Sequence, residues 1–289
     1  MSDRVLRSVH RGDGFHWVGD GFYVTQVLPG SHELHLAADP FLMLDYQAPK
    51  IYPATNTPRG VGVHPHRGFE TVTIAFEGRV AHHDSTGAGG VIGPGDVQWM
   101  TAASGVLHKE YHEAEWAKSG GMFHMMQLWV NLPGKHKMDP PGYQALLKEE
   151  MGRVDLTGGG NVTLIAGELN GVRGPARTFT PIELWDVRLG ANEHAELEVT
   201  DGHTEMVFPI EGEISTIGGT VGLQSLGVFE RNGDRLVLDA GPSGARVIVL
   251  GGQPINENVI FHGPFAMNTV EEINQAIEDF NAGKFGQLV

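Results

Sequence analysis

Residues 64–78 read HPHRGFETVTIAFEG, in which two histidines precede a β-branched run that ends at a Glu-Gly pair. Residues 203–212 read HTEMVFPIEG and keep the same order of histidine, apolar run and Glu-Gly pair. In both halves a Gly-Asp pair comes later, at Gly95-Asp96 and at Gly233-Asp234. This weak internal repeat, with loop insertions between corresponding positions, predicts two related β domains, each a barrel or a sandwich.

Short runs rich in β-branched and aromatic residues, bounded by Gly, Pro, Asp or Asn, recur along the rest of the chain. The 41 glycines and 16 prolines are spread along the sequence, which favours many tight turns over long helices. The predicted strands are Phe22–Val27, Thr71–Phe76, Met126–Leu132, Ile182–Leu189, Glu205–Ile210 and Arg246–Leu250. The sequence therefore predicts an all-β fold.

One helix is predicted near the C-terminus, where Thr269 and Glu272 have the spacing of a capping box. Its predicted apolar face consists of Val270, Ile273, Ile277 and Phe280. A second short helix is predicted over residues 143–151. Residues 46–62 and 152–161 are predicted to be loops, and the second, which is rich in glycine, is interpreted as an interdomain linker.

Composition excludes several classes of protein. The net charge of −15, from 20 Lys and Arg against 35 Asp and Glu, opposes direct binding to a nucleic-acid backbone. The sequence has no Cys, so disulfides, thiolate metal sites and a Cys nucleophile are excluded. It also has no run of eighteen apolar residues and no signal-peptide core. We therefore expect a soluble, cytoplasmic protein that does not enter a membrane. A monomer is the default expectation for its oligomeric state.

Histidine is distributed unevenly. Residues 1–144 contain 12 of the 15 histidines and carry a net charge of −3, whereas residues 145–289 contain 3 histidines and carry −12. Because imidazole serves as a metal ligand and as an acid or base near neutral pH, this asymmetry indicates that the first half uses histidine for a function that the second half lacks.

The chemistry concentrates in two short motifs. His64 and His66 stand two residues apart, and His108 and Glu110 repeat that spacing. Alternate side chains of a strand share a face, so two such pairs on facing strands would present three imidazole nitrogens and one carboxylate oxygen. This donor set suits a divalent transition metal ion that is intermediate between hard and soft, with coordination positions left open for a substrate. These four residues are the predicted metal ligands, and Glu70 is the rival for the fourth position or an acceptor beside the site.

Further residues are candidates for the surroundings of this site. Four histidines are candidates for hydrogen bonds to the ligands or for substrate contact, and each is also explained as an ordinary satisfied or solvated side chain: His82, His83, His112 and His124. The predicted walls of an apolar pocket, which are equally explained as barrel core, are Trp99, Met100, Met122, Phe123 and Met125.

Five blocks of the sequence carry a family resemblance. They are DPFLMLDY (39–46), HPHRGFETVTIAFEGRVAHHDSTG (64–87), PGDVQWMTAASGVLHKEYHE (94–113), MMQLWVNLP (125–133) and PINENVIFHGPFAMNTVEEINQAIEDFNAGKFG (254–286). Together they resemble the pirin family of the cupin superfamily, in the family's order and over most of the chain. The sequence departs from the family at His83, where Glu is usual, and at Lys109, where small residues are common.

The resemblance implies a bicupin, which is two jelly-roll β-barrels with a short C-terminal helix. A metal-binding barrel is expected over residues 1–150, and a second barrel without metal, plus the helix, over residues 151–289. It implies one divalent metal, Fe(II) by preference, whereas the donor set alone also accepts Mn, Co, Ni, Cu or Zn. The family's ligands correspond to His64, His66, His108 and Glu110. The second barrel keeps only His203 and Glu205 around the repeat.

The resemblance also implies a function, quercetin 2,3-dioxygenase activity on a small aromatic substrate. In this reading Glu110 takes the proton of the flavonol 3-hydroxyl as general base. The alternative is a redox-responsive regulator that binds a transcription factor or a metabolic enzyme without turnover. Metal-dependent isomerisation or hydrolysis stays open as a third reading, because a fold does not determine a reaction.

Overall fold

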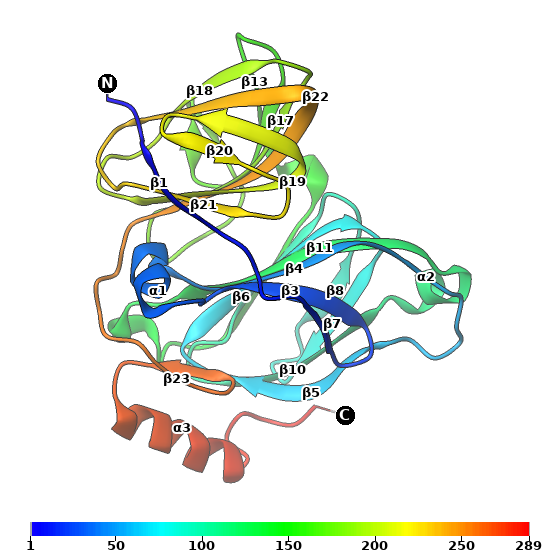
Figure 1. Ribbon diagram of the computed structural model, residues 1–289. Coiled ribbons are helices and arrows are strands. Elements are labelled where there is room, and N and C mark those ends of the chain that lie inside the picture. The colour runs from blue at the N-terminus through cyan, green and yellow to red at the C-terminus, as the bar shows by residue number, and fades with distance from the viewer. Residues whose placement is uncertain (1, 289) are drawn as a thin grey trace. The chain divides into compact units, whose positions relative to one another are not determined.

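The computed structural model describes residues 2–288, and Figure 1 traces its elements along the chain. Antiparallel strands dominate, which confirms the predicted all-β fold. The chain forms two compact units. Unit 1 contains the described residues up to Gly12 with Pro29–Pro40 and Glu149–Pro254, and unit 2 contains Asp13–Leu28, Phe41–Lys148 and the described residues from Ile255 onward. Within the described range, no helix has the length and apolar character needed to cross a membrane.

Unit 1 is built on one nine-stranded sheet. Its strands are β1 (Leu6–His10), β13 (Gly152–Asp155), β14 (Asn161–Ala166), β17 (Ile182–Leu189), β18 (His194–Glu198), β19 (Thr204–Thr216), β20 (Gly219–Val221), β21 (Leu226–Phe229) and β22 (Arg235–Gly252). They run in the order β1-β21-β19-β22-β17-β14-β13, with β18 paired to β22 and β20 paired to β19. The hairpin of β15 (Glu168–Leu169) and β16 (Val172–Arg173) and the helix α1 (His32–Ala38) complete the unit.

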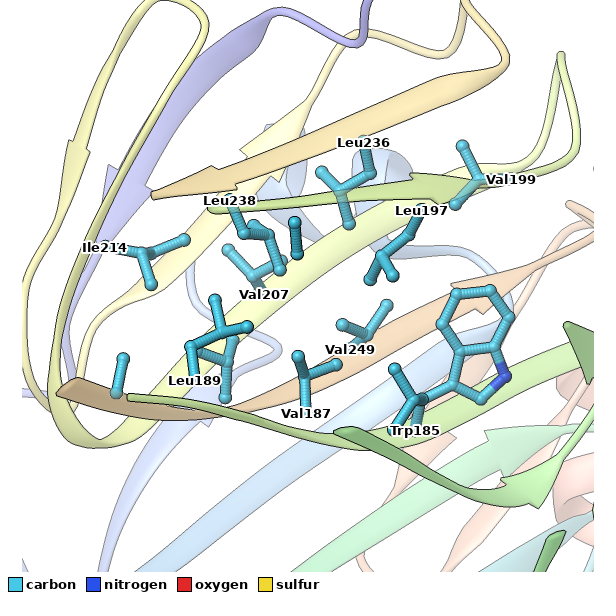
Figure 2. Packing of buried hydrophobic residues seen from close by; sticks show 14 of the residues in the cluster. Trp185, Val187, Leu189, Leu197, Val199, Val207, Ile214, Leu236, Leu238 and Val249 are labelled. Carbon is cyan, nitrogen blue, oxygen red and sulfur yellow. The ribbon is translucent and has the colours of Figure 1, made fainter. Parts of the chain in front are cut away.

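The core of unit 1 follows from the alternation of strand side chains. Trp185, Val187 and Leu189 stand at every second position of β17 and all belong to one buried cluster, together with Val249 of the neighbouring β22 and Val207 of β19, the strand beyond it (Figure 2). The Trp185 Nε1 atom donates to the carbonyl oxygen of Ala166 at 3.1 Å, which satisfies the indole inside the core.

Unit 2 contains two larger sheets. The seven-stranded sheet consists of β2 (Phe15–Val18), β3 (Phe22–Leu28), β4 (Phe41–Tyr52), β6 (Phe69–Glu77), β9 (Val97–Thr101), β11 (Gly121–Asn131) and β12 (Gly142–Leu146), in the order β12-β9-β6-β11-β4-β3-β2. The four-stranded sheet consists of β5 (Gly60–His66), β7 (Val80–Asp84), β8 (Gly89–Ile92) and β10 (Val106–His112), in the order β5-β10-β7-β8.

The remaining elements of unit 2 are short. They are the hairpin of β23 (Ile260–His262) and β24 (Phe265–Met267), the helices α2 (Ala114–Ser119) and α3 (Val270–Asn281), and the 3₁₀ turn η1 (Gly134–His136). Figure 1 shows α3, in red, alongside β23. All six strands predicted from the sequence are present, with ends that differ by a few residues.

Two of the predicted loops are largely strand. The loop expected over residues 46–62 is confined to residues 53–59, because β4 continues to Tyr52 by pairing with β11. The glycine-rich stretch 152–161 is not an interdomain linker, since it begins with β13, turns over residues 156–160 and enters β14. These two strands pair directly with each other in the sheet of unit 1.

The helix predicted over residues 143–151 is wrong in its first half. Residues Gly142–Leu146 form β12, because their backbone groups pair with the edge strand β9. A 3₁₀ turn, η2 (Lys148–Glu150), is the helical part of this stretch. Tertiary pairing has therefore overridden local helix propensity.

The C-terminal helix is present with its capping box. The Thr269 hydroxyl accepts from the Glu272 amide, and the Glu272 carboxylate accepts from the Thr269 amide, both at 3.1 Å. The buried face differs from the predicted one, because Val270 is 55% exposed and Phe280 is 38% exposed. The side chains buried from α3 are those of Ile273, Ala276 and Asp279.

A buried ion pair ties α3 to the chain just before β6. The Arg67 Nη1 atom donates to Asp279 Oδ2 at 2.9 Å, and both side chains are more than nine-tenths buried. Arg67 also donates through Nε to the Ser104 carbonyl oxygen at 2.7 Å and lies over the ring of Phe285. Hydrogen bonds from Lys284 and from Arg67 hold the pKa of Asp279 at about 2, below its usual value.

We predict that Asp279→Asn lowers the free energy of unfolding by about 3 kcal/mol, because the buried guanidinium of Arg67 loses its counter-ion. Asp155→Asn is the matched control, since Asp155 pairs with Arg153 in solvent and its loss should cost less than about 1 kcal/mol. Urea unfolding at pH 7 measures both. Equal losses in the two variants would contradict a structural role for the buried pair.

The same variant tests the pH dependence of this contact. The folded-state pKa of Asp279 is about 2 and lies below the ordinary value of 3.8, so the carboxylate stabilises the fold above pH 3.8. The advantage of the wild type over Asp279→Asn should therefore stay constant down to about pH 4 and decline as the pH falls through about 2. A decline already complete at about pH 5 would contradict the ion pair.

Candidate metal centre

The two histidine-bearing motifs lie on neighbouring strands of the four-stranded sheet. His64 and His66 are at the end of β5, and His108 and Glu110 are on β10. The strands are antiparallel, and His64 stands directly opposite His108. Gly60 permits this pairing beyond the bulge in β10, because a Cβ atom there would lie 2.1 Å from the Glu110 carbonyl oxygen. The motifs are thus side by side in one sheet.

The structure brings the three predicted imidazoles into one cluster. One nitrogen from each of His64, His66 and His108 lies within 4.8 Å of the others. The ring centroids are 4.1 Å apart for His64 and His108, 4.7 Å for His66 and His108, and 4.9 Å for His64 and His66. His66 and His108 are buried, whereas His64 is partly exposed, so solvent reaches the cluster on the side of His64.

Hydrogen bonds fix the tautomers of two of these rings. The Nδ1 atom of His64 lies 2.8 Å from the Gly62 carbonyl oxygen, and that of His66 lies 3.3 Å from the carbonyl oxygen of Pro264. A carbonyl oxygen can only accept, so both Nδ1 atoms carry hydrogen and both Nε2 atoms keep a lone pair. The Nε2 atom of His108 is buried and has no hydrogen-bond partner within residues 2–288.

Burial keeps the inner imidazoles neutral. It lowers the pKa of His66 to about 3, with a further contribution from His64, and it lowers the pKa of His108 well below its usual value. At neutral pH these rings therefore offer lone pairs that protons do not occupy. An unpaired buried nitrogen is costly, and coordination of a metal ion would satisfy it. The residues present fit a transition-metal ion.

Glu110 belongs to a second group that shares His108. One donor atom from each of His82, His108 and Glu110 lies within 4.8 Å of the others, and all three side chains are buried. Glu110 does not join the group of His64, His66 and His108 within that distance. Two candidate donor sets therefore overlap at His108, and together they contain four imidazoles and one carboxylate.

Side chains of the seven-stranded sheet hold the Glu110 carboxylate. Gln98 donates to Oε1 at 3.0 Å, Gln127 donates to Oε2 at 3.0 Å, and the Thr73 hydroxyl donates to Oε1 at 3.3 Å. The Tyr143 hydroxyl in turn donates to Gln98 Oε1 at 3.5 Å. These contacts orient the carboxylate in the interior of unit 2 and leave Oε2 with capacity for a further bond.

The other candidate residues take different positions. His82 lies beside the cluster, with its ring centroid 5.3 Å from that of His108. His112 donates to the Gly21 carbonyl oxygen at 2.9 Å and packs on aromatic rings, and burial lowers its pKa to about 4. His124 bonds to the Tyr46 hydroxyl, and His83 is exposed. Only His82 of these four is therefore near the candidate metal ligands.

An apolar pocket borders the cluster. Its apolar wall consists of Val18, Phe22, Val24, Val61, Val80 and Met125. Its polar wall consists of Asp45, His64, Thr73, Glu110 and Gln127. Burial raises the pKa of Asp45 to about 6. The hairpin of β2 and β3 supplies half of the apolar wall, and nothing in the sequence near the histidine motifs indicates it.

Four of the five predicted wall residues lie elsewhere. Trp99 and Met100 are fully buried in the core, and Phe123 is fully buried in the same apolar cluster as Phe22 and Met125 but does not line the pocket. Met122 is 40% exposed and does not line the pocket. Met125 alone was predicted correctly. Trp99 and Met100 are successive residues of β9, and Met122 and Phe123 are successive residues of β11, so in each pair the two side chains point to opposite faces and cannot both line one pocket.

Glu70 is a buried acid on β6 outside both donor groups. It accepts a hydrogen bond from the Thr101 hydroxyl at 2.7 Å, and burial raises its pKa to about 7 from 4.5. The folded protein therefore keeps this proton to higher pH than the unfolded chain does. Its contribution to stability falls as the pH rises from about 4.5 to about 7.

We predict that Glu70→Gln, which cannot ionise, gains stability over the wild type by roughly 3 kcal/mol between pH 5 and pH 8. Urea unfolding of the metal-free proteins at the two pH values measures the difference. Glu77→Gln changes an exposed residue at the end of the same strand and should show the same offset at both pH values. A pH-independent offset for Glu70→Gln would contradict a buried acid of raised pKa.

Comparison with known proteins gives the family. The pirin family model matches residues 21–130, and the model of the pirin C-terminal cupin domain matches residues 184–286. A protein of Pseudomonas aeruginosa named "Putative quercetin 2,3-dioxygenase PA2418" is 48% identical over 93% of this chain and 94% of its own. Human pirin is 37% identical over 86% of this chain and 83% of its own.

Solved structures agree with this assignment. A crystal structure of quercetin 2,3-dioxygenase from Acinetobacter baumannii superposes with a TM-score of 0.94 at 43% identity and covers all of both chains. The bacterial pirin YhhW of Escherichia coli, solved in complex with nickel(II), shares the fold with a TM-score of 0.63 at 17% identity, over 86% of this chain and 99% of its own. This chain belongs to the pirin family and has N- and C-terminal cupin domains.

Proposed function

We propose that this pirin is a mononuclear metal-dependent quercetin 2,3-dioxygenase. The observation that carries the proposal is the convergence of three neutral imidazoles beside an apolar pocket that also contains Glu110. Relatives that share 43% and 48% of their residues with this chain bear the name of that activity. The proposal concerns unit 2, where both donor groups lie.

The proposed ligands are His64, His66 and His108 through nitrogen and Glu110 through oxygen. Fe(II) is the proposed ion, and the same donors accept Mn, Co, Ni, Cu or Zn. When bound, iron supplies a Lewis-acidic, redox-capable centre for the reaction of a flavonol with dioxygen. For Glu110 to join the three imidazoles, its carboxylate has to shift towards them. Gln98 and Gln127 already orient the carboxylate, and the shift has to stay within the range of their side chains.

Glu110 is also the proposed general base. Its Oε2 atom accepts one hydrogen bond, from Gln127, so one lone pair is left, and it takes the proton of the flavonol 3-hydroxyl when the carboxylate is not bound to the ion. The apolar wall of the pocket suits the aromatic rings of that substrate, and Phe22 offers a ring for contact.

We predict that iron-loaded protein, mixed with quercetin without oxygen and then exposed to it, bleaches the flavonol absorption band and releases carbon monoxide. His108→Ala should lose at least about a hundredfold in turnover and most of its metal, since it removes a ligand that both donor groups share. His83→Ala, at an exposed position of the neighbouring strand, should keep both. Wild-type protein that contains one iron ion per chain and leaves quercetin unchanged would contradict the proposal.

A regulatory role is the second candidate. Residues 145–289 carry a net charge of −12, which suits the recognition of a basic protein partner. Oxidation of a bound iron would change the charge of the site by one unit and so bias the partner's affinity. Capture of a transcription factor or metabolic enzyme by Fe(II) but not Fe(III) protein supports this role, and equal recovery by both forms opposes it.

A further inference from the structure

Three buried side chains form a hydrogen-bonded series on adjacent strands of unit 2. His82 and Asp84 lie on β7, and His108 lies on β10, directly opposite Asp84. The His82 Nε2 atom is 3.3 Å from Asp84 Oδ2, and its Nδ1 atom is 3.4 Å from the Nδ1 atom of His108. All three side chains are at least 97% buried, so water does not compete for these contacts.

We propose that Asp84 and His82 position His108 by fixing the tautomer whose Nε2 lone pair points to the metal. This inference rests on the proposed function, because it assigns a role in the same site. His82 and Asp84 are positioning residues in this proposal, since they act through His108.

The hydrogen-bond roles follow from the acid at the end of the series. Asp84 Oδ1 already accepts three hydrogen bonds, from the amide and hydroxyl of Thr86 and from the amide of Ala88, so Oδ2 is the atom that faces His82. A carboxylate only accepts, and His82 Nε2 must therefore carry a hydrogen atom. In a neutral imidazole the other nitrogen is then an acceptor.

The acceptor nitrogen of His82, Nδ1, determines which nitrogen of His108 carries the hydrogen atom. The His108 Nδ1 atom faces His82 Nδ1 and must donate to it, which leaves the lone pair on His108 Nε2. That Nε2 atom is the buried nitrogen without a partner. His64 and His66 reach the same state through backbone carbonyl oxygens, so the three rings share one tautomer through hydrogen bonds to three different acceptors.

The same contacts argue against His82 as a ligand. Both of its nitrogens are engaged, one with Asp84 and one with His108, while the series stands. Tyr143 stacks on its ring with centroids 5.1 Å apart and an angle of 13° between the planes, which holds the ring in this orientation. His82 therefore acts on the metal site through His108, although its nitrogen lies within reach of Glu110.

The first test reverses the direction of the hydrogen bonds that run from His108 through His82 to Asp84. In Asp84→Asn the three donors on Oδ1 require the oxygen there, so the amide nitrogen faces His82 Nε2 as a donor. His82 must then accept at Nε2 and donate from Nδ1, and His108 must accept at Nδ1 and carry its hydrogen on Nε2. The two-bond ¹⁵N–¹H correlations of the histidine rings in metal-free protein show which nitrogen is protonated, with His108→Gln used to assign the signals.

We predict hydrogen on His108 Nδ1 in the wild type and on Nε2 in Asp84→Asn. Calorimetric titration with Co(II) should show affinity weakened by roughly ten- to a hundredfold in that variant. An unchanged His108 tautomer, or unchanged Co(II) affinity, would overturn the proposal. A wild type that has this tautomer but takes up no metal would instead contradict the proposed function.

A pair of substitutions at His82 separates positioning from packing. His82→Phe keeps a ring to stack on Tyr143 but removes the acceptor, and it should weaken Co(II) binding to a similar extent. His82→Asn places an amide oxygen where Nδ1 was, and it should restore affinity to within a few-fold of the wild type. If His82→Asn binds as weakly as His82→Phe and both change the visible Co(II) spectrum as loss of a ligand does, His82 is a ligand and the proposal is wrong.

Discussion

The candidate site depends on three imidazole rings that are held with Nε2 unprotonated. Each ring gives its Nδ1 hydrogen to a different acceptor, the carbonyl oxygens of Gly62 and Pro264 for His64 and His66, and, in our proposal, His82 for His108. Burial adds to this by lowering the pKa values of the two inner rings. Hydrogen bonding and desolvation therefore act together to present neutral nitrogen donors, which are the form of histidine that a metal ion requires.

The fold of unit 2 supplies these acceptors from distant parts of the chain. Pro264 belongs to the turn between β23 and β24, far in sequence from His66. The segment is held by the pairing of Arg67 with Phe265, by the buried ion pair with Asp279, and by Lys137, which donates to the carbonyl oxygens of Gly68 and Ala266. The C-terminal helix thus stabilises the hairpin that fixes one of the imidazoles.

The sequence predicted the all-β fold and the capped C-terminal helix, because these depend on local patterns. The strands that carry the histidine motifs were not predicted from composition and were inferred only from the spacing of the motifs. A spacing of two residues on a strand is sufficient to place His64 and His66 on one face. The orientation of the Glu110 carboxylate could not be predicted from the sequence in the same way, since hydrogen-bond donors from another sheet hold it. The pocket wall around Val18 and the strand that contains Tyr143 were missed, because both depend on pairing between segments remote in sequence.

The most direct measurement of the central claim is the position of a bound ion. Crystals soaked in Co(II) or Fe(II), with diffraction recorded at the absorption edge of the metal, give an anomalous difference map that locates it. We expect one strong peak in unit 2, bounded by the Nε2 atoms of His64, His66 and His108. A peak bounded instead by His82, His108 and Glu110, or no peak near His108 at saturating metal, would contradict the account.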